Sequence, residues 1–387
     1  MRLQVRISVV AAAVFAGAHL SPFSVTSSQA GLVGLGEPRV GYTFHYFSDV
    51  EGVTVHTHYI TGGVNMARNV TLSAQYAHDI VVFPAVDATP GSQEAVDAIT
   101  TASRPIASNA DPYEDFVKER DEFQATATFR GLVTSYYVST ESDYFAQMVS
   151  AGYSHGFLRD NLTLAGGASY SRDNIQPLED ADTDANPDYR NTWHANLVVT
   201  QILTPTTVVR VGAEYNRVRG LQHVPYRNVY VAGTNVPERH PKYRDRRDAF
   251  VHVSQYVTNR SSIKVDYRYY EDDWGVASHT IGGKLSQYVT DNVVVRYRYR
   301  YYSQIPAFFF RDDYAAAGGV DGFQTNDYRL GDYGAHLFGG RIMWFPHGAL
   351  GNVRFLRDVH FVIGYEHYFN SNNFTANIVE TGMRISF

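Results

Sequence analysis

The sequence predicts an all-β protein, a transmembrane antiparallel β-barrel of about sixteen strands. Three observations predict this fold. Polar and apolar residues alternate along most of the chain, which is the period of a β-strand. Aromatic residues make up 14% of the chain, with 29 tyrosines and 22 phenylalanines. After the N-terminus, no segment has the run of roughly eighteen apolar residues that a membrane-spanning helix requires.

The clearest strand covers residues 293–302, with the sequence VVVRYRYRYY. Valines and tyrosines share one face, and Arg296, Arg298 and Arg300 lie on the other. The apolar face changes from valine to tyrosine along the strand, as a surface would where it passes from hydrocarbon into a headgroup region. The arginines are then expected to face the interior, which is polar in transmembrane barrels.

Composition excludes several other classes of protein. A mean hydropathy of −0.27 is too polar for a bundle of membrane helices. Cysteine is absent, which fits an exported barrel that needs no disulfides. The formal charge of −6 is too small to predict a nucleic-acid partner. The sequence has no glycine loop for phosphate and no zinc motif, so we predict neither a cofactor nor a metal.

Residues 1–30 are predicted to be a cleaved signal peptide. Arg2 and Arg6 precede an apolar, alanine-rich segment over residues 7–18, and Ser28-Gln29-Ala30 places small residues where cleavage requires them. The alternative, a membrane anchor, needs a longer apolar run. Residues 31–387 are then a single barrel domain, which we expect in the outer membrane of a Gram-negative bacterium.

The alternation also predicts where the strands and long loops lie. Loops are expected at 84–115, 173–188, 219–245 and 303–332. With an even number of strands, all four fall on one side of the membrane, as the long extracellular loops of bacterial barrels do. Strands are expected at 39–47, 53–62, 70–76, 122–130, 132–139, 144–155, 162–170, 189–202, 206–217, 249–256, 263–270, 276–288, 293–302, 334–345, 359–369 and 374–387.

The last five residues, MRISF, form an alternating segment that ends on Phe387. This ending resembles the C-terminal signal of outer-membrane barrels, which implies the barrel-insertion machinery as a partner. An aromatic residue at this place would lie in the periplasmic interface belt.

Several short stretches resemble a family of uncharacterised bacterial outer-membrane barrels that is known only as a domain of unknown function. The stretches are VDAITTASRP at 96–105 followed by ERDE at 119–122, STESDY at 139–144 and DYRL at 327–330. The resemblance implies an outer-membrane barrel. It implies no activity, because none is assigned to that family.

The candidate site is the polar interior of the barrel. The residues expected to line a pore are Arg296, Arg298, Arg300, Arg210, Glu214, Lys264, Asp266 and Arg268. Two interpretations are open. The arginines form an anion-selective wall, or the interior charges pair across strands, which is the simpler interpretation. A barrel of about sixteen strands leaves an aqueous interior unless a loop plugs it.

Other motifs give weaker indications. His56 and His58 share a strand face near His45, and such a pair can ligate a metal, but a chain with 15 histidines produces such pairs by chance. The basic runs at 239–242 and 244–247 could bind anionic lipopolysaccharide or a substrate, and a solvated loop is the simpler interpretation. The acidic stretches 179–184 and 271–273 lack the spacing of a calcium loop, so we expect them to be solvated.

Three functions remain open at this point. The first is a porin-like channel or transporter for small polar solutes. The second is a barrel, plugged by 84–115, by 303–332 or by another protein, that acts as a structural or docking partner of an envelope complex. Phe308-Phe309-Phe310 would then be an apolar contact of the plug or a loop tip that touches a partner. The third and weakest is an enzyme. The sequence has no G-x-S-x-G element, so we predict no catalytic residue and no enzyme.

Overall fold

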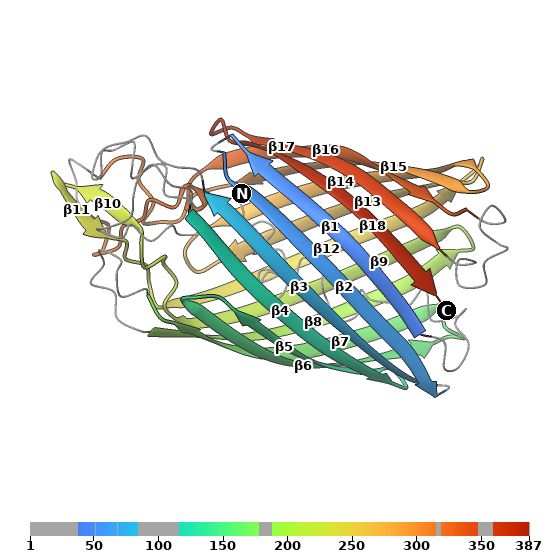
Figure 1. Cartoon of the computed structure of the whole chain (residues 1–387). Helices are drawn as coiled ribbons and strands as arrows, with labels where there is room; N and C mark the ends of the chain where they lie inside the picture. The colour runs from blue at the N-terminus through green and yellow to red at the C-terminus, as the bar shows by residue number, and fades with distance from the viewer. Residues whose placement is uncertain are drawn as a thin grey trace.

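The computed structural model describes residues 38–386 except for 51, 68, 84–115, 178–187, 315–318 and 347–358. In this part of the chain, sixteen antiparallel strands close into one barrel, as predicted (Figure 1). The signal peptide predicted at 1–30, the 84–115 loop, the acidic stretch 179–184 and Phe387 lie outside the described residues.

The barrel strands follow one another around the ring in sequence order, and β1 pairs with β18 to close it. In the sequence, a separate hairpin of β10 (Asn228–Val231) and β11 (Thr234–Pro237) comes between β9 and β12, which pair directly with each other in the barrel. A short 3-10 helix, η2 (Tyr328–Leu330), precedes β16. The barrel strands are β1 (Pro38–Asp49), β2 (Thr54–Ala67), β3 (Val70–Phe83), β4 (Phe116–Phe129), β5 (Leu132–Thr140), β6 (Tyr144–Phe157), β7 (Leu162–Ile175), β8 (Asp188–Thr204), β9 (Thr207–Gly220), β12 (Tyr243–Val257), β13 (Ser261–Asp272), β14 (Ala277–Thr290), β15 (Val293–Gln304), β16 (Tyr333–Trp344), β17 (His360–Asn370) and β18 (Thr375–Ser386).

The two ends of the barrel differ in their connections. The long connections, 84–115, 176–187, 221–242 and 305–332, all leave the same end, which we call the loop end. At the opposite, turn end, the connections are short apart from 345–359. This is the arrangement that the strand count predicted. No helix in the described part of the chain is long and apolar enough to cross a bilayer.

Several strands are longer at the loop end than the sequence predicted. β3 continues to Phe83 instead of residue 76, and β4 begins at Phe116 instead of residue 122. Within these extensions Asp79 lies directly opposite Arg120. The two charges neutralise each other on one face, so the strands continue beyond the point where the alternation of polar and apolar residues stops.

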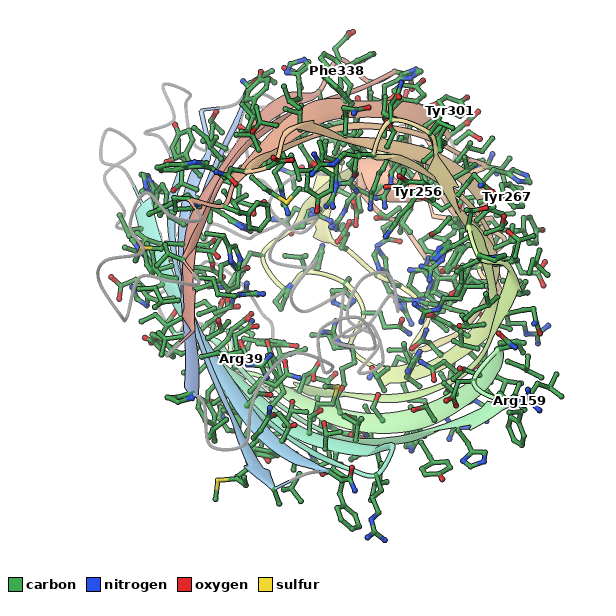
Figure 2. All side chains as sticks on the ribbon, turned by 90° about the vertical axis from the view of Figure 1, so that its right-hand side faces the viewer. Arg39, Arg159, Tyr256, Tyr267, Tyr301 and Phe338 are labelled. Carbon is green, nitrogen blue, oxygen red and sulfur yellow. The ribbon has the colours of Figure 1, made fainter. Side chains whose placement is uncertain are left out.

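The outer and inner faces of the barrel differ as predicted. Figure 2 shows Tyr267 and Phe338 on the outside of the ring. Many outward side chains are large, apolar and exposed; Val265 is 49% and Leu197 60% exposed. A closed band of exposed apolar side chains of this kind is incompatible with water and fits a barrel surrounded by lipid.

A ring of outward tyrosines encircles the barrel towards the loop end. In seven of the eight described hairpins that close at this end, the tyrosine hydroxyl bonds a polar side chain on the next strand at 2.5–3.0 Å. The partner always lies opposite the residue two positions after the tyrosine. The pairs are Tyr42–His58, Tyr76–Asp121, Tyr170–Asn191, Tyr215–Asp245, Tyr267–His279, Tyr299–His336 and Tyr365–Asn377.

In the eighth hairpin, β5–β6, the register places Gln147 in the same position relative to Tyr136. The repeated geometry makes one level of phenol hydroxyls around the molecule. Rings with one apolar side and one polar end concentrate where lipid meets water. We call this level the tyrosine ring.

Candidate functional site

All eight residues that the sequence predicted to line the lumen lie on the inner face. Tyr267 points outward, so its neighbours Asp266 and Arg268 point inward, and Lys264 shares their face. Tyr299 lies opposite the outward Phe338, so the three arginines of β15 also face inward. Arg268 Nη2 lies 3.3 Å from Glu214 Oε1, which places Glu214 inside, and Arg210 shares its face of β9. Their part in solute passage stays a prediction.

The inner face of β13–β16 brings cations directly opposite one another. Lys284 lies between Lys264 on β13 and Arg298 on β15, and Arg296 lies opposite Arg341 on β16. Like charges directly opposite on antiparallel strands are destabilising, by about 0.2–1 kcal/mol a pair. We call the following six residues the cationic wall: Lys264, Lys284, Arg296, Arg298, Arg300 and Arg341.

Acidic side chains compensate the cationic wall only in part. Arg298 Nη1 bonds Glu366 Oε1 at 2.7 Å, and Arg341 forms an ion pair with Glu380. Within the described part of the chain, Lys264 and Lys284 form no ion pair. The same holds for Arg296, whose Nε donates to Ser286 Oγ at 3.0 Å. The predicted pairing across strands is therefore present for some lumen charges and absent for others.

The same division applies to the remaining lumen charges that the sequence singled out. Arg268 contacts both Glu214 and Asp248, at 3.3 and 3.2 Å. Arg210 and Asp266 form no ion pair with any described residue. Arg210 instead holds its guanidinium 5.9 Å from the centre of the Phe250 ring, which also faces the lumen.

Lys284 and Arg341 were not among the residues predicted to line the lumen. The alternation would have placed both residues on the inner face, since each stands at an inward position of a predicted strand. Two glycines leave room beside the cations. Gly282 lies opposite Arg300, and a Cβ there would come within 2.4 Å of Asp266 Oδ2. Gly339 lies opposite Arg298, and a Cβ there would meet the Tyr365 carbonyl oxygen at 2.3 Å.

The wall of β3–β5 near the loop end is also charged, but its charges are paired. Arg120 bonds Asp79, from Nε to Oδ2 at 2.9 Å, and lies 3.0 Å from Glu122. The side chains of all three are only 3% exposed. A second set adjoins it: Lys118 Nζ lies 2.7 Å from both Glu141 and Asp143. The set has four acids for two cations, so each cation is neutralised, and we call these six residues the neutralised wall. Four of them come from the stretches 119–122 and 139–144 that carry the family resemblance.

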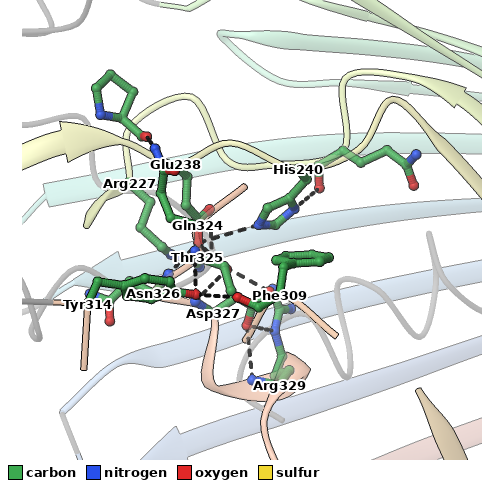
Figure 3. A network of polar contacts seen from close by, with 12 residues as sticks. Arg227, Glu238, His240, Phe309, Tyr314, Gln324, Thr325, Asn326, Asp327 and Arg329 are labelled. Carbon is green, nitrogen blue, oxygen red and sulfur yellow. Dashed lines mark hydrogen bonds and ion pairs between the residues drawn. The ribbon is translucent and has the colours of Figure 1, made fainter. Parts of the chain in front are cut away.

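Two long connections, 221–242 and 305–332, meet in a buried polar network above the barrel (Figure 3). Glu238 is its centre, with a side chain that is fully buried. It accepts hydrogen bonds from Thr325 Oγ1 at 2.6 Å, from the Asn326 backbone at 2.8 Å and from Arg227 at 3.3 Å. We call the following residues the loop cluster: Arg227, Glu238, His240, Thr325, Asp327 and Arg329.

Further contacts anchor the loop cluster. Arg227 lies 3.5 Å from Asp327, which also bonds Arg329. Arg239 and Gln324 exchange backbone hydrogen bonds at 3.0 Å, which joins the two connections directly. Tyr226 donates its hydroxyl to Asp143 Oδ2 at 2.9 Å and so ties this assembly to the neutralised wall. The sequence indicated only the 327–330 end of this network.

The Phe308-Phe309-Phe310 run divides between the two roles that the sequence left open. Phe309 is fully buried among Trp274, Leu330 and His240, whereas Phe308 is 45% exposed. The buried ring is therefore part of the apolar core of the loop assembly. The exposed ring is available at its surface.

Burial and neighbouring charges shift the pKa values of three groups in these connections. Burial alone would raise the pKa of Glu238, but Arg227 and His240 outweigh it and lower the pKa to about 2. The same competition holds the pKa of Asp327 well below its usual range, chiefly through Arg329 and Arg227. Burial, assisted by His240, lowers the pKa of His223 to about 4. The network is thus built for ionised carboxylates and a neutral His223.

Two expectations about charged stretches were wrong. Residues 244–247 are not part of a solvated loop but lie on β12, where Arg244 and Arg246 face inward and Arg247 faces outward, and His240 of the first run is buried. The acidic turn 271–273 is not simply solvated. The Asp272 carboxylate is fully buried and accepts a 2.8 Å hydrogen bond from Arg244 Nε. In both cases the alternation of the strand sends neighbouring charges to opposite faces.

The histidines near the first hairpin do not converge. His56 and His58 lie on the outer face against Phe44, and His45 lies on the inner face near Glu380. Among the described residues, no group of three or more His, Asp or Glu side chains is placed to hold a metal ion. Any metal binding by the pair stays untested.

Comparisons with known proteins agree with the fold and give no activity. A family model described as protein of unknown function (DUF3570) matches residues 8–345. No curated protein matches the sequence. Among solved structures, OprD from Pseudomonas aeruginosa is similar at 12% identity with a TM-score of 0.46, covering 94% of this chain and 99% of that chain.

Two further barrels are similar at the same level. OmpT, an outer membrane protein of Vibrio cholerae, has 10% identity and a TM-score of 0.46 in its trimer form, covering 92% of this chain and all of that chain. The siderophore receptor PirA from Pseudomonas aeruginosa has 8% identity and a TM-score of 0.42, covering 87% of this chain and 57% of that chain. At these identities and TM-scores the similarities do not indicate a shared function.

Proposed function

We propose that the protein is a channel for small anionic solutes in the outer membrane of a Gram-negative bacterium. The chain belongs to the DUF3570 family of proteins of unknown function. The proposal therefore rests on the residues that line the lumen. The exposed apolar outer face and the tyrosine ring support the membrane location. Long connections at one end and short turns at the other support an orientation with the loop end outside the cell.

The cationic wall carries the proposal. The register sets Lys264, Lys284 and Arg298 side by side across three strands, and Arg296 beside Arg341. Such rows cost stability, and sequences tend to depart from locally favourable choices at functional sites. Rings or rows of Arg and Lys are what anion pores use to concentrate their solutes. Guanidinium groups also fit carboxylate and phosphate oxygens two at a time, which favours solutes that carry these groups.

Conductance of the refolded mature protein in a planar lipid bilayer tests the proposal. We expect steady single-channel currents and, under a salt gradient, a reversal potential that shows a preference for chloride over potassium. A folded barrel that shifts on heat-modifiability gels but never conducts would contradict an open channel. A conducting barrel that prefers cations would contradict the anionic solute.

The loop cluster favours a second candidate, a plugged barrel that docks an envelope protein. The buried Arg227–Asp327 ion pair and the hydrogen bonds from Thr325 and Asn326 to Glu238 hold 221–242 and 305–332 together. Phe308, Tyr230 and Ile305 are exposed on or beside these connections, at 45%, 53% and 56%. A fixed surface with exposed aromatic side chains suits a protein partner. Absence of conductance together with capture of a defined envelope partner would support this candidate over the channel. No catalytic residue is proposed, and the absence of an enzymatic activity stays a prediction.

A further inference from the structure

The outer face of the barrel carries a row of basic and aromatic side chains near the loop end. It runs across four neighbouring strands, because Arg172 on β7 lies opposite Asn191 on β8, Asn191 opposite Arg219 on β9, and Arg219 opposite Tyr243 on β12. Arg172 and Arg219 are exposed. They are two strands apart, so their Cα atoms are separated by about 10 Å.

Aromatic rings hold both guanidinium groups at the surface. The Arg172 guanidinium lies 5.3 Å from the centre of the Tyr189 ring. The Arg219 guanidinium lies 5.9 Å from the Trp193 ring and 5.5 Å from the Tyr243 ring. A guanidinium stacked on rings keeps its N–H donors available at its edge, and its position is partly fixed before a ligand arrives.

The charge of these two arginines is not cancelled within the described part of the chain, where neither forms an ion pair. Neighbouring basic residues each have an acidic residue near or opposite them. Arg217 is paired with Asp245 at 2.9 Å, Lys242 lies 3.7 Å from Asp188, and Arg247 lies opposite Glu271 in the register. Among the described residues of this sector, Arg172 and Arg219 are exposed cations that are stacked on aromatic rings and form no ion pair.

The height of the row above the membrane is set by the tyrosine ring. Arg172 follows Tyr170 by two residues, and Arg219 follows Tyr215 by four, both towards the loop end. The tyrosine hydroxyls mark the boundary of the hydrocarbon. Because the Tyr170 hydroxyl bonds Asn191, which belongs to the row, the row lies at this boundary, where the lipid headgroups begin.

We propose that this row binds the phosphorylated headgroup of lipopolysaccharide in the outer leaflet, with Arg172 and Arg219 as its phosphate ligands. Two arginines about 10 Å apart on one face suit a headgroup that carries two phosphates. The proposal rests on the outer-membrane location proposed above and is independent of conduction, so a barrel that never conducts leaves it intact.

The test is binding of bisphosphoryl lipid A to the refolded mature protein in detergent micelles, measured by native mass spectrometry over a titration. The test variant is Arg172→Gln with Arg219→Gln. The matched control is Arg130→Gln with Arg159→Gln, which removes the same charge from exposed turns at the opposite end of the barrel. We expect the test variant to bind about tenfold more weakly than the wild type, and the control to bind like the wild type. A gel-shift assay for heat modifiability verifies that each variant is folded.

Two further arms distinguish lipid from a free anion and from a loss of structure. Removing the phosphates from lipid A should weaken its binding to the wild type and leave its binding to the test variant unchanged. Arg172→Lys with Arg219→Lys keeps the charge and should retain part of the affinity. Equal affinity of wild type and test variant, equal loss in the control, or complete competition by inorganic phosphate at the concentration of the lipid would overturn the proposal.

Discussion

The cationic wall and the neutralised wall line the same barrel and solve the problem of interior charge in opposite ways. In the neutralised wall each cation has two acids within 3.0 Å, and the Arg120 side chain is 3% exposed. In the cationic wall Lys284 has cations opposite it on both sides. The first arrangement closes its charges off from any ligand. The second leaves positive potential directed into the lumen, so it is the wall that can act on a solute.

The loop cluster belongs with the neutralised wall in this comparison. Its carboxylate Glu238 is fully buried and receives its hydrogen bonds from groups of both long connections. Charge there joins segments that are far apart in the sequence. We infer that the fully compensated clusters hold this molecule together and that the cationic wall, whose charge is compensated only in part, carries its function.

The largest effect on stability is expected from Asp79→Asn, which removes one of the two countercharges of the buried Arg120 and leaves only Glu122. Breaking one partner of a buried ion pair costs on the order of 3 kcal/mol. The matched variant is Asp266→Asn, on the inner face of β13 beside the cationic wall. Asp266 forms no ion pair with a described residue, so this variant should change stability far less. Thermal unfolding in detergent, followed by heat modifiability, measures both. Equal destabilisation by the two variants would contradict the claim that the ion pairs of the neutralised wall stabilise the barrel and the charges beside the cationic wall do not.

The loop cluster should open as the pH falls, in two steps. His223 has a pKa of about 4, below its ordinary 6.5, so its contribution is present above pH 6.5 and lost as the pH falls to about 4. Glu238 has a pKa of about 2, below its ordinary 4.5, so its contribution is lost between pH 4.5 and about 2.

Fluorescence of Trp274 follows this opening, since the Trp274 ring packs against His240 and Phe309. Replacing the other two tryptophans, Trp193 and Trp344, by phenylalanine isolates its emission. We expect a red shift across both steps, and a smaller lower step in Glu238→Gln, in which Asp327 still has to be protonated. Emission that stays constant from pH 7 down to about 2 would show that these groups do not hold the cluster together.

The smallest effect has the opposite sign. Arg296→Gln removes one member of the like-charge pair with Arg341 and should stabilise the barrel slightly, by about 0.5 kcal/mol. Arg120→Gln, on the neutralised wall, should destabilise it. Unfolding midpoints of the two variants under identical detergent conditions decide the matter. A clear loss of stability in Arg296→Gln would mean that this arginine is structural after all.

The alternation of the sequence was sufficient to predict the barrel, its strand count and the side on which the long connections lie. Period-two patterns are local, and the parity of the strand count links them to the ends of the barrel. The same patterns placed the arginines of 293–302 on the inner face. Strand ends were less predictable, because the pairing of Asp79 with Arg120 joins residues 41 positions apart in the chain.

The loop cluster could not be predicted for the same physical reason. Glu238 and Thr325 are separated by 87 positions, and no periodic pattern links two irregular connections. The cationic wall could be predicted in part. Its individual cations follow from alternation, but the facing of Lys284 with Arg298, and of Arg296 with Arg341, depends on register, which a single sequence does not specify.

The most direct test of the account is the ion selectivity of the variant in which Arg296, Arg298 and Arg300 are all changed to serine. Its reversal potential under a salt gradient is compared with that of the wild type and of the Arg130→Gln, Arg159→Gln control in the same bilayer. We expect the chloride-to-potassium permeability ratio to fall by about tenfold in the triple variant, because three of the cations that attract the anion are removed. A tenfold change corresponds to ~1.4 kcal/mol of lost interaction between anion and wall. The control should keep the wild-type ratio. An unchanged ratio in a folded, conducting triple variant would contradict the claim that the cationic wall selects the solute.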